Sequence, residues 1–88
     1  MNVQTLKEYA LDVIPEEQKE VFSKLYDGNI IDRQRLLKGC INHFYDAKFK
    51  ENDNDTASTV IDTSIEFEVS ISTIQNVIYK FRNVRLDF

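Results

Sequence analysis

The sequence predicts an all-α fold, a small bundle of four or five helices in a single domain spanning residues 1–88. The chain has six Phe and four Tyr among 88 residues, so it has enough bulky side chains for one modest core. Two Gly and one Pro are too few for the many turns of a sandwich or barrel. Apolar residues also recur at spacings of three and four, which is typical of helices with one buried face.

The first two helices are expected near residues 3–13 and 15–27. Pro15 separates them and suits the first turn of the second helix, where its missing N–H costs nothing. Gly28, between Asp27 and Asn29, is a strong stop signal. The apolar stripe of the first helix consists of Val3, Leu6, Ala10, Val13 and Ile14, and that of the second of Phe22, Leu25 and Tyr26.

A third helix is expected over residues 32–49, with Asp32 as its N-cap. Its continuous apolar stripe predicts the central helix of the core, and Gly39 within it predicts a close approach by a neighbour. The stripe consists of Leu36, Leu37, Cys40, Ile41, Phe44 and either Ala47 or Lys48. The opposite, polar side is expected to carry Arg33, Arg35, Lys38, Asn42 and Asp46.

Residues 51–58 are polar and predict a loop, followed by a helix near 59–67 that Ser58 or Thr59 caps. A calcium loop is the sharper alternative, because Glu51, Asp53 and Asp55 alternate. An EF-hand counted from Asp53 requires glycine at its sixth position and glutamate at its twelfth. Serine occupies both positions, so the calcium interpretation fails.

The last helix is expected over residues 71–82, with Ser70 as its cap and Val69 filling the short turn before it. The alternating tail 83–88 predicts either a short strand or an extended arm. Its apolar residues would face one side, where they either contact a second copy of the chain or fold back over their own domain. These residues are Val84, Leu86 and Phe88.

The segment from Phe67 to Lys80, FEVSISTIQNVIYK, resembles the VSxSTI/V core of helix-turn-helix families found in small bacterial, phage and mobile-element regulators. The resemblance covers residues 59–82. It implies that the last helix docks in a DNA major groove, where Gln and Asn pair with adenine and Ile contacts a thymine methyl group. The residues expected at the DNA are Ser70, Ile71, Ser72, Thr73, Gln75, Asn76, Tyr79, Lys80 and Arg82. The chain departs from the family at Glu68, where glycine is common, and at Thr63, where an aliphatic residue is common.

The resemblance predicts a sequence-specific double-stranded DNA-binding protein, a small transcriptional regulator. Because a single small helix-turn-helix reads only a few base pairs, we expect a homodimer on a repeated half-site or a larger complex with a protein partner. The alternative is a helical protein–protein interaction module, an adaptor or inhibitor that uses the same fold without DNA. The net charge of −4 favours that alternative. Residues 51–69 carry six acids and no base, whereas residues 70–88 carry three bases and one acid. The position of the bases relative to the last helix therefore distinguishes the two interpretations.

The sequence predicts no enzyme, no cofactor, no metal site and no small-molecule substrate. His43 has no Cys or acidic partner at helical metal-ligand spacing, and Cys40 lies on the apolar stripe, where it is expected to be a buried packing residue. The N-terminal residues lack the pattern of a signal peptide, and no apolar run is long enough to span a membrane. With a single cysteine, this predicts a cytoplasmic protein.

Overall fold

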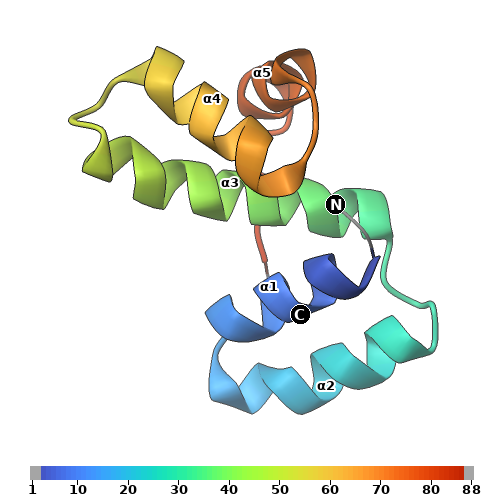
Figure 1. Ribbon diagram of the computed structural model, residues 1–88. Helices are drawn as coiled ribbons and strands as arrows, with labels where there is room; N and C mark the ends of the chain where they lie inside the picture. Colours follow the sequence, from blue (N-terminus) through green and yellow to red (C-terminus); the bar gives the residue numbers. More distant parts are fainter. Residues whose placement is uncertain (1–2, 87–88) are drawn as a thin grey trace.

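The computed structural model describes residues 3–86, and over this range the chain forms five α-helices, as the sequence predicts. The longest helix, α3, crosses the middle of the molecule (Figure 1). Helices α1 and α2 lie on one side of it, and α4 and α5 lie on the other. The elements are α1 (Val3–Val13), α2 (Glu16–Asp27), α3 (Arg33–Glu51), α4 (Thr56–Phe67) and α5 (Ile71–Lys80).

The core forms around α3, which packs against α1, α4 and α5, while α2 packs against α1. On α3 the buried apolar side chains are Leu36, Cys40, Ile41 and Tyr45. They pack in one cluster with Leu6, Ala10 and Ile14 of α1, Phe22 and Tyr26 of α2, Val60 and Phe67 of α4, and Ile74 and Val77 of α5. Of the stripes predicted for the first two helices, Leu6, Ala10, Ile14, Phe22 and Tyr26 are confirmed as buried, whereas Val13 and Leu25 are only partly buried. The side chain of Val3 lies outside the described residues.

Local capping explains the observed helix boundaries. The Asp32 carboxylate accepts hydrogen bonds from the backbone N–H groups of Gln34 and Arg35, at 2.9 and 3.3 Å, and starts α3 as predicted. Helix α3 runs two residues beyond its predicted end, to Glu51. Helix α4 begins three residues earlier than predicted, because Asp55 is its N-cap.

The prediction that Ser58 or Thr59 caps α4 was therefore wrong. Asp55 accepts hydrogen bonds from the N–H groups of Ala57 and Ser58, at 3.1 and 3.4 Å, so Ser58 already lies in the first turn. Only four residues remain between α3 and α4. Two of them, Asp53 and Asn54, have positive φ angles, a conformation that Asp and Asn tolerate better than most residues.

Asn42 was wrongly assigned to the polar side of α3, since its side chain is fully buried. Its amide nitrogen donates to the backbone carbonyls of Phe81 and Val84, at 2.8 and 3.0 Å. A buried amide is stable when its hydrogen bonds are satisfied, and the chain beyond α5 supplies the acceptors. The sequence pattern alone gave no sign of these acceptors, which lie about forty residues further along the chain.

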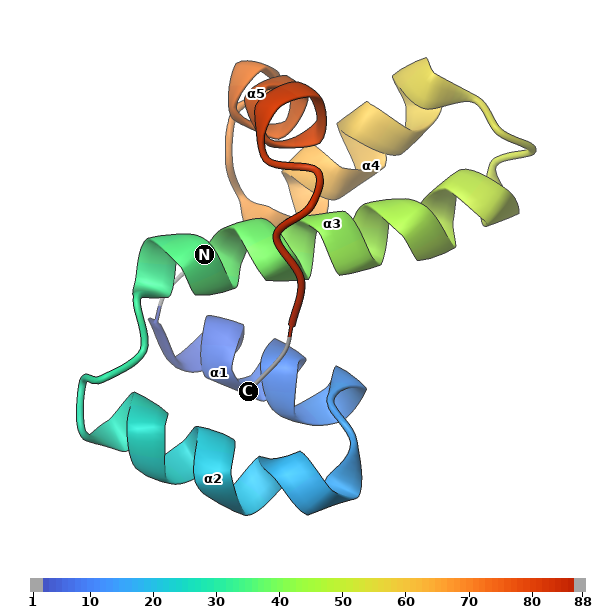
Figure 2. The same cartoon turned by 180° about the vertical axis from the view of Figure 1, so that it is seen from behind.

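The tail after α5 forms no strand within the described residues. It crosses α3 as an extended arm toward α1 (Figure 2). The helix itself ends at Lys80, two residues before its predicted end. Val84 is buried, and Leu86 packs against the core of its own domain. A Cβ atom added to Gly39 would lie 3.1 Å from the Leu86 side chain and 3.2 Å from the Arg85 backbone, so the close neighbour predicted for this glycine is the tail. Phe88 lies outside the described residues.

None of the described helices combines the length and apolar character that crossing a membrane requires.

Candidate nucleic-acid interface

The turn between α4 and α5 adopts the left-handed conformation at Glu68, with φ 54° and ψ 43°. The N–H of Val69 donates to the carbonyl of Ser64 at 3.1 Å, which closes the end of α4. The family that the sequence resembles commonly has glycine at this position, where glycine avoids the steric cost of a left-handed conformation. The glutamate makes the same turn at a cost of about 1–2 kcal/mol.

Buried side chains hold the corner between the two helices. Phe67 and Ile74 are fully buried, and the Phe67 ring makes edge contacts with Tyr9 and Phe44, at centroid distances of 5.4 and 5.7 Å. Val69, expected to be buried, is only partly so, although it packs against the same cluster. The corner is thus sealed mainly by Phe67 and Ile74.

Thr63, a polar residue on the buried side of α4, leaves no unsatisfied hydroxyl group. It is fully buried, and its hydroxyl donates to the carbonyl of Thr59 at 2.7 Å. Thr59 is also fully buried, and its hydroxyl donates to the carbonyl of Asp55 at 2.6 Å. The hydroxyl of each buried threonine is therefore satisfied by the backbone carbonyl four residues earlier.

Ser70 caps α5, as predicted. Its hydroxyl oxygen accepts from the N–H of Thr73 at 3.1 Å, and the two hydroxyls lie 2.9 Å apart. Both hydroxyl groups are therefore used in fixing the start of α5.

The outer side of α5 carries most of the remaining predicted site residues. Ile74 and Val77 face the core, so positions on the opposite side of the helix point outward. The exposed residues are Ile71, Ser72, Gln75, Asn76, Tyr79 and Lys80. The structure thus brings these six side chains onto one accessible surface, together with the exposed Thr73.

Arg82 differs from the other predicted site residues, because its guanidinium group is engaged within the domain. One nitrogen donates to the side-chain oxygen of Asn42 at 3.1 Å, and another forms an ion pair with Asp46. The group also lies 5.3 Å from the centroid of the Tyr45 ring. Arg82 therefore joins the end of α5 to α3, and its charge is largely balanced by Asp46.

Two bases of α3, Lys38 and Arg33, are engaged away from the start of α5. Lys38 lies over the ring of Phe81, 3.9 Å from its centroid, at the far end of α5. Arg33 lies over Tyr26 at 4.6 Å and donates to Asn29, at the corner between α2 and α3. By contrast, acidic side chains on α4 and its turn precede the start of α5. They are Asp62, Glu66 and Glu68.

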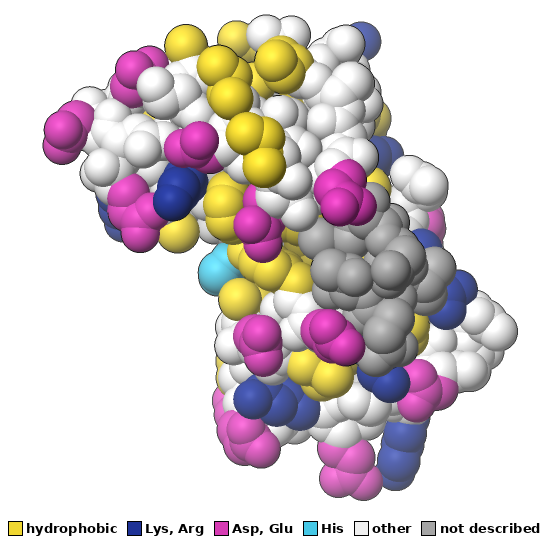
Figure 3. Space-filling view, in the orientation of Figure 1, with side chains coloured by type: hydrophobic (Ala, Val, Ile, Leu, Met, Phe, Trp, Pro, Cys, Tyr) yellow, Lys and Arg dark blue, Asp and Glu magenta, His cyan; other side chains and the backbone are white. Residues whose placement is uncertain are grey.

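The exposed apolar residues of α4 were missed by the sequence analysis. Ile61 and Ile65 lie one helical turn apart on α4, and their side chains are 47% and 70% exposed. With Ile71 and Tyr79 of α5 they form an apolar row over the two helices, and Figure 3 shows acidic side chains beside it. The signal was present in the sequence: Val60, Thr63 and Phe67 define the buried side of α4, which leaves Ile61 and Ile65 on the other.

A groove of about 390 Å³ lies between α4 and α5 within this surface. It is lined by Thr56, Ala57, Val60, Ile61, Ile71, Gln75 and Tyr79. Three residues of the predicted DNA-contact set thus also line an apolar depression. These three are Ile71, Gln75 and Tyr79.

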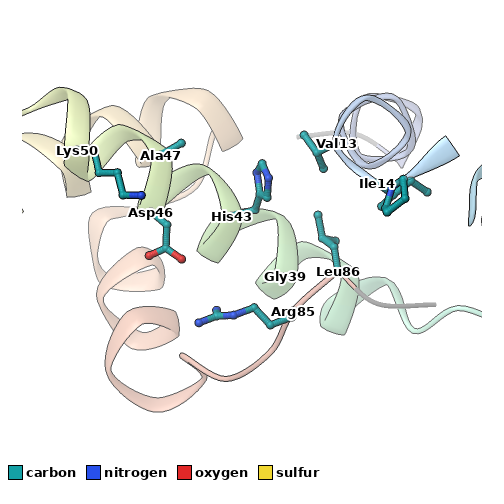
Figure 4. A pocket seen from close by; sticks show the side chains of 10 residues that line it. Val13, Ile14, Gly39, His43, Asp46, Ala47, Lys50, Arg85 and Leu86 are labelled. Atoms are coloured by element: carbon teal, nitrogen blue, oxygen red, sulfur yellow. The ribbon is translucent and has the colours of Figure 1, made fainter.

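A second cavity, of about 380 Å³, lies between α1, α3 and the tail (Figure 4). His43, Asp46 and Lys50 of α3 line one side, and Arg85 and Leu86 line the other. His43 is exposed, and its Nδ1 atom lies 3.0 Å from the hydroxyl of Tyr9. Burial raises the pKa of Tyr9 well above its usual value, and the negative charge of Glu66 adds to the effect.

Cys40 is fully buried on α3, as predicted, and burial raises the pKa of its thiol to about 12. Among the residues that the structure describes, no three His, Cys, Asp or Glu side chains are grouped so that they could hold a metal ion.

Comparison with known proteins gives no relative from which to transfer a function: no family model, no curated protein and no solved structure matches the chain.

Proposed function

We propose that this protein binds double-stranded DNA in a sequence-specific manner, with α5 as the recognition helix, and acts as a small cytoplasmic transcriptional regulator of the phage or mobile-element type. The observation that carries the proposal is the corner between α4 and α5. A left-handed residue at Glu68, a serine cap at Ser70 and a buried Ile74 coincide with an outward polar face on the second helix. That combination presents the start of a helix to the major groove.

Within this proposal, the exposed side chains of α5 have different roles at the DNA. Gln75 and Asn76 supply paired donors and acceptors that match the major-groove edge of adenine. Ile71 supplies an apolar contact for a thymine methyl group, and Ser72 hydrogen-bonds a base or a phosphate. Tyr79 and Lys80 contact the backbone, while Arg82 fixes the angle of α5 on α3.

The charge distribution predicts a modest electrostatic contribution to DNA affinity. Lys80 is the exposed base on α5, while Arg82 pairs with Asp46 and Lys38 lies on the Phe81 ring. Each phosphate neutralised adds roughly 0.9 to the slope of log affinity against log salt, so few free bases give a shallow slope. Two copies on a repeated half-site would supply additional contacts. The tail is a poor candidate for that dimer contact, because Val84 and Leu86 pack within their own domain.

Selection from a random duplex library at low salt tests the proposal, followed by titration of the enriched sequence with variants. Asn76→Ala should weaken binding to the enriched site by about 1–3 kcal/mol, and should relax discrimination at one base pair. Ile30→Ser, at an exposed position in the α2–α3 connection, is the matched control and should bind as the unaltered protein does. Absence of any enriched sequence for a folded sample would contradict the proposal.

A protein-interaction module without DNA binding is the second candidate, and the isoleucines on α4 favour it. The bases Arg33, Lys38 and Arg82 lie away from the start of α5, and acids lie near it. Exposed apolar side chains such as those of Ile61 and Ile65 do not contribute to phosphate binding. Rows of exposed apolar side chains are typical of surfaces that contact other proteins.

A further inference from the structure

We infer that the α4–α5 surface formed by Ile61, Ile65, Ile71 and Tyr79 docks an apolar protein segment flanked by Lys or Arg. The four side chains are between 46% and 75% exposed, and Ile61, Ile71 and Tyr79 line a groove of about 390 Å³. This inference develops the second candidate function by naming the surface and its ligand. It does not require α5 to bind DNA.

The groove gives the surface a shape as well as an apolar character. The buried Val60 of α4 is part of its lining, together with the exposed Ile61 of α4 and Ile71 of α5. Ile65 extends the apolar row by one further turn of α4. An elongated apolar row beside a groove fits the side chains of a helix or an extended segment that repeat along one face.

The acidic residues around this surface indicate that its partner carries positive charge. From residue 51 to residue 69 the chain carries six acids and no base, and α4 lies entirely within this range. Asp62 and Glu66 follow Ile61 and Ile65 directly in the sequence, and Asp55 caps the end of α4 at which the groove begins. Lys48 of α3 lies near Asp62 and Glu66 and pairs with Glu51, so it balances part of this charge and leaves an acidic excess. Hydrogen bonds from the Ser58 hydroxyl and backbone lower the pKa of Asp55, which keeps its carboxyl ionised. A segment with basic flanks is attracted to this border.

The same border disfavours the other occupants. An anionic lipid surface would be repelled by the acids of α4 beside the row. In a symmetric dimer the same patch lies on both subunits, so packing α4 against its own copy would bring acidic borders together. A different chain with opposite charge avoids this repulsion while burying the same apolar side chains.

The inference can be tested by titrating the isotopically labelled full chain with three synthetic helical peptides of equal length and recording NMR spectra. The first carries a leucine stripe flanked by lysines, the second the same stripe flanked by glutamates, and the third the lysines with serine in place of leucine. We expect the leucine–lysine peptide to bind at least about tenfold more tightly than either of the others. Its chemical-shift changes should centre on Ile61, Ile65 and Ile71.

Variants assign the binding to this surface. Ile65→Ser should weaken the leucine–lysine peptide by about tenfold, because it removes a largely exposed side chain that binding would bury. Ile30→Ser, equally exposed but in the α2–α3 connection, should leave its affinity unchanged. Asn76→Ala, chosen to impair DNA recognition, should also leave peptide affinity unchanged, so that failure of the DNA proposal and failure of this inference are separate results.

Three outcomes would overturn the inference. The first is equal affinity for the lysine and glutamate peptides, and the second is shift changes centred elsewhere on the chain. The third is self-association of the unaltered protein in sedimentation experiments that Ile65→Ser abolishes, since a second copy would then be the occupant of the surface.

Discussion

Asn42 of α3 and Arg82, two residues beyond α5, are joined by a hydrogen bond of 3.1 Å between the guanidinium group and the amide oxygen. The amide nitrogen of the same asparagine holds the carbonyls of Phe81 and Val84. One buried side chain thus fixes both the end of α5 and the tail to the central helix.

Asn42→Leu should destabilise the protein by about 1–3 kcal/mol, because it leaves two carbonyl groups without their donor at a buried position. Urea unfolding followed by circular dichroism measures the change. Asn83→Ala, at an exposed position in the same tail, is the control and should stay within about 0.5 kcal/mol of the unaltered protein. Equal stability of the two variants would contradict the role assigned to Asn42.

Glu68→Gly should stabilise the protein by roughly 0.5–1 kcal/mol, since the relief of left-handed strain exceeds the added freedom of the unfolded chain. Glu66→Gly, two residues earlier and within α4, should instead cost about 1 kcal/mol, because glycine is unfavourable inside a helix. Thermal unfolding of the pair measures the difference. If both glycines destabilise equally, the turn does not have the left-handed residue described for it.

Ile74→Ala should destabilise the protein by roughly 2–5 kcal/mol, because the side chain is fully buried at the corner between α4 and α5. Ile65→Ala removes the same atoms from a position that is 70% exposed and should cost far less. Denaturant titration of both variants provides the comparison. A loss below about 1 kcal/mol for Ile74→Ala would mean that the corner is not packed as described.

Asp55 should contribute to the loss of stability in acid. The Ser58 hydroxyl, with the backbone N–H groups of Ser58 and Ala57, holds the pKa of Asp55 below its usual value of 3.8. A carboxyl with a lowered folded-state pKa stabilises the fold above its unfolded-state pKa, and this stabilisation is lost as the pH falls through the folded-state value. The stability advantage of the unaltered protein over Asp55→Asn should therefore shrink as the pH falls below 3.8. Unfolding curves collected across that range would show a constant difference if the ionised cap were unimportant.

The sequence predicted the five helices because each has a clear apolar period and a chemical boundary signal, such as Pro15, Gly28 or Ser70. Errors arose where two signals competed. Asp55 and Ser58 are both good caps, and the structure uses the earlier one. At the other end, α5 stops at Lys80 because the chain turns so that the carbonyls of Phe81 and Val84 can reach Asn42.

The candidate site was predictable only where it depends on local chemistry. The cap at Ser70, the turn at Glu68 and the outward face of α5 follow from neighbouring residues. The ion pair between Arg82 and Asp46 joins residues that are 36 positions apart, so no local sequence pattern predicts it. The groove between α4 and α5 similarly depends on the angle at which the two helices cross, and helical periodicity in the sequence does not predict that angle.

The tail that crosses α3 also has a kinetic consequence. Its hydrogen bonds to Asn42 span 39 and 42 residues, whereas the turn between α4 and α5 is closed by contacts only a few residues apart. Closing a long loop costs more entropy than closing a short one, so the helix pair should form early and the tail should dock late. By the same reasoning, local opening of the native protein should begin at the tail, and backbone amides around Val84 should exchange with solvent faster than those in the middle of α3.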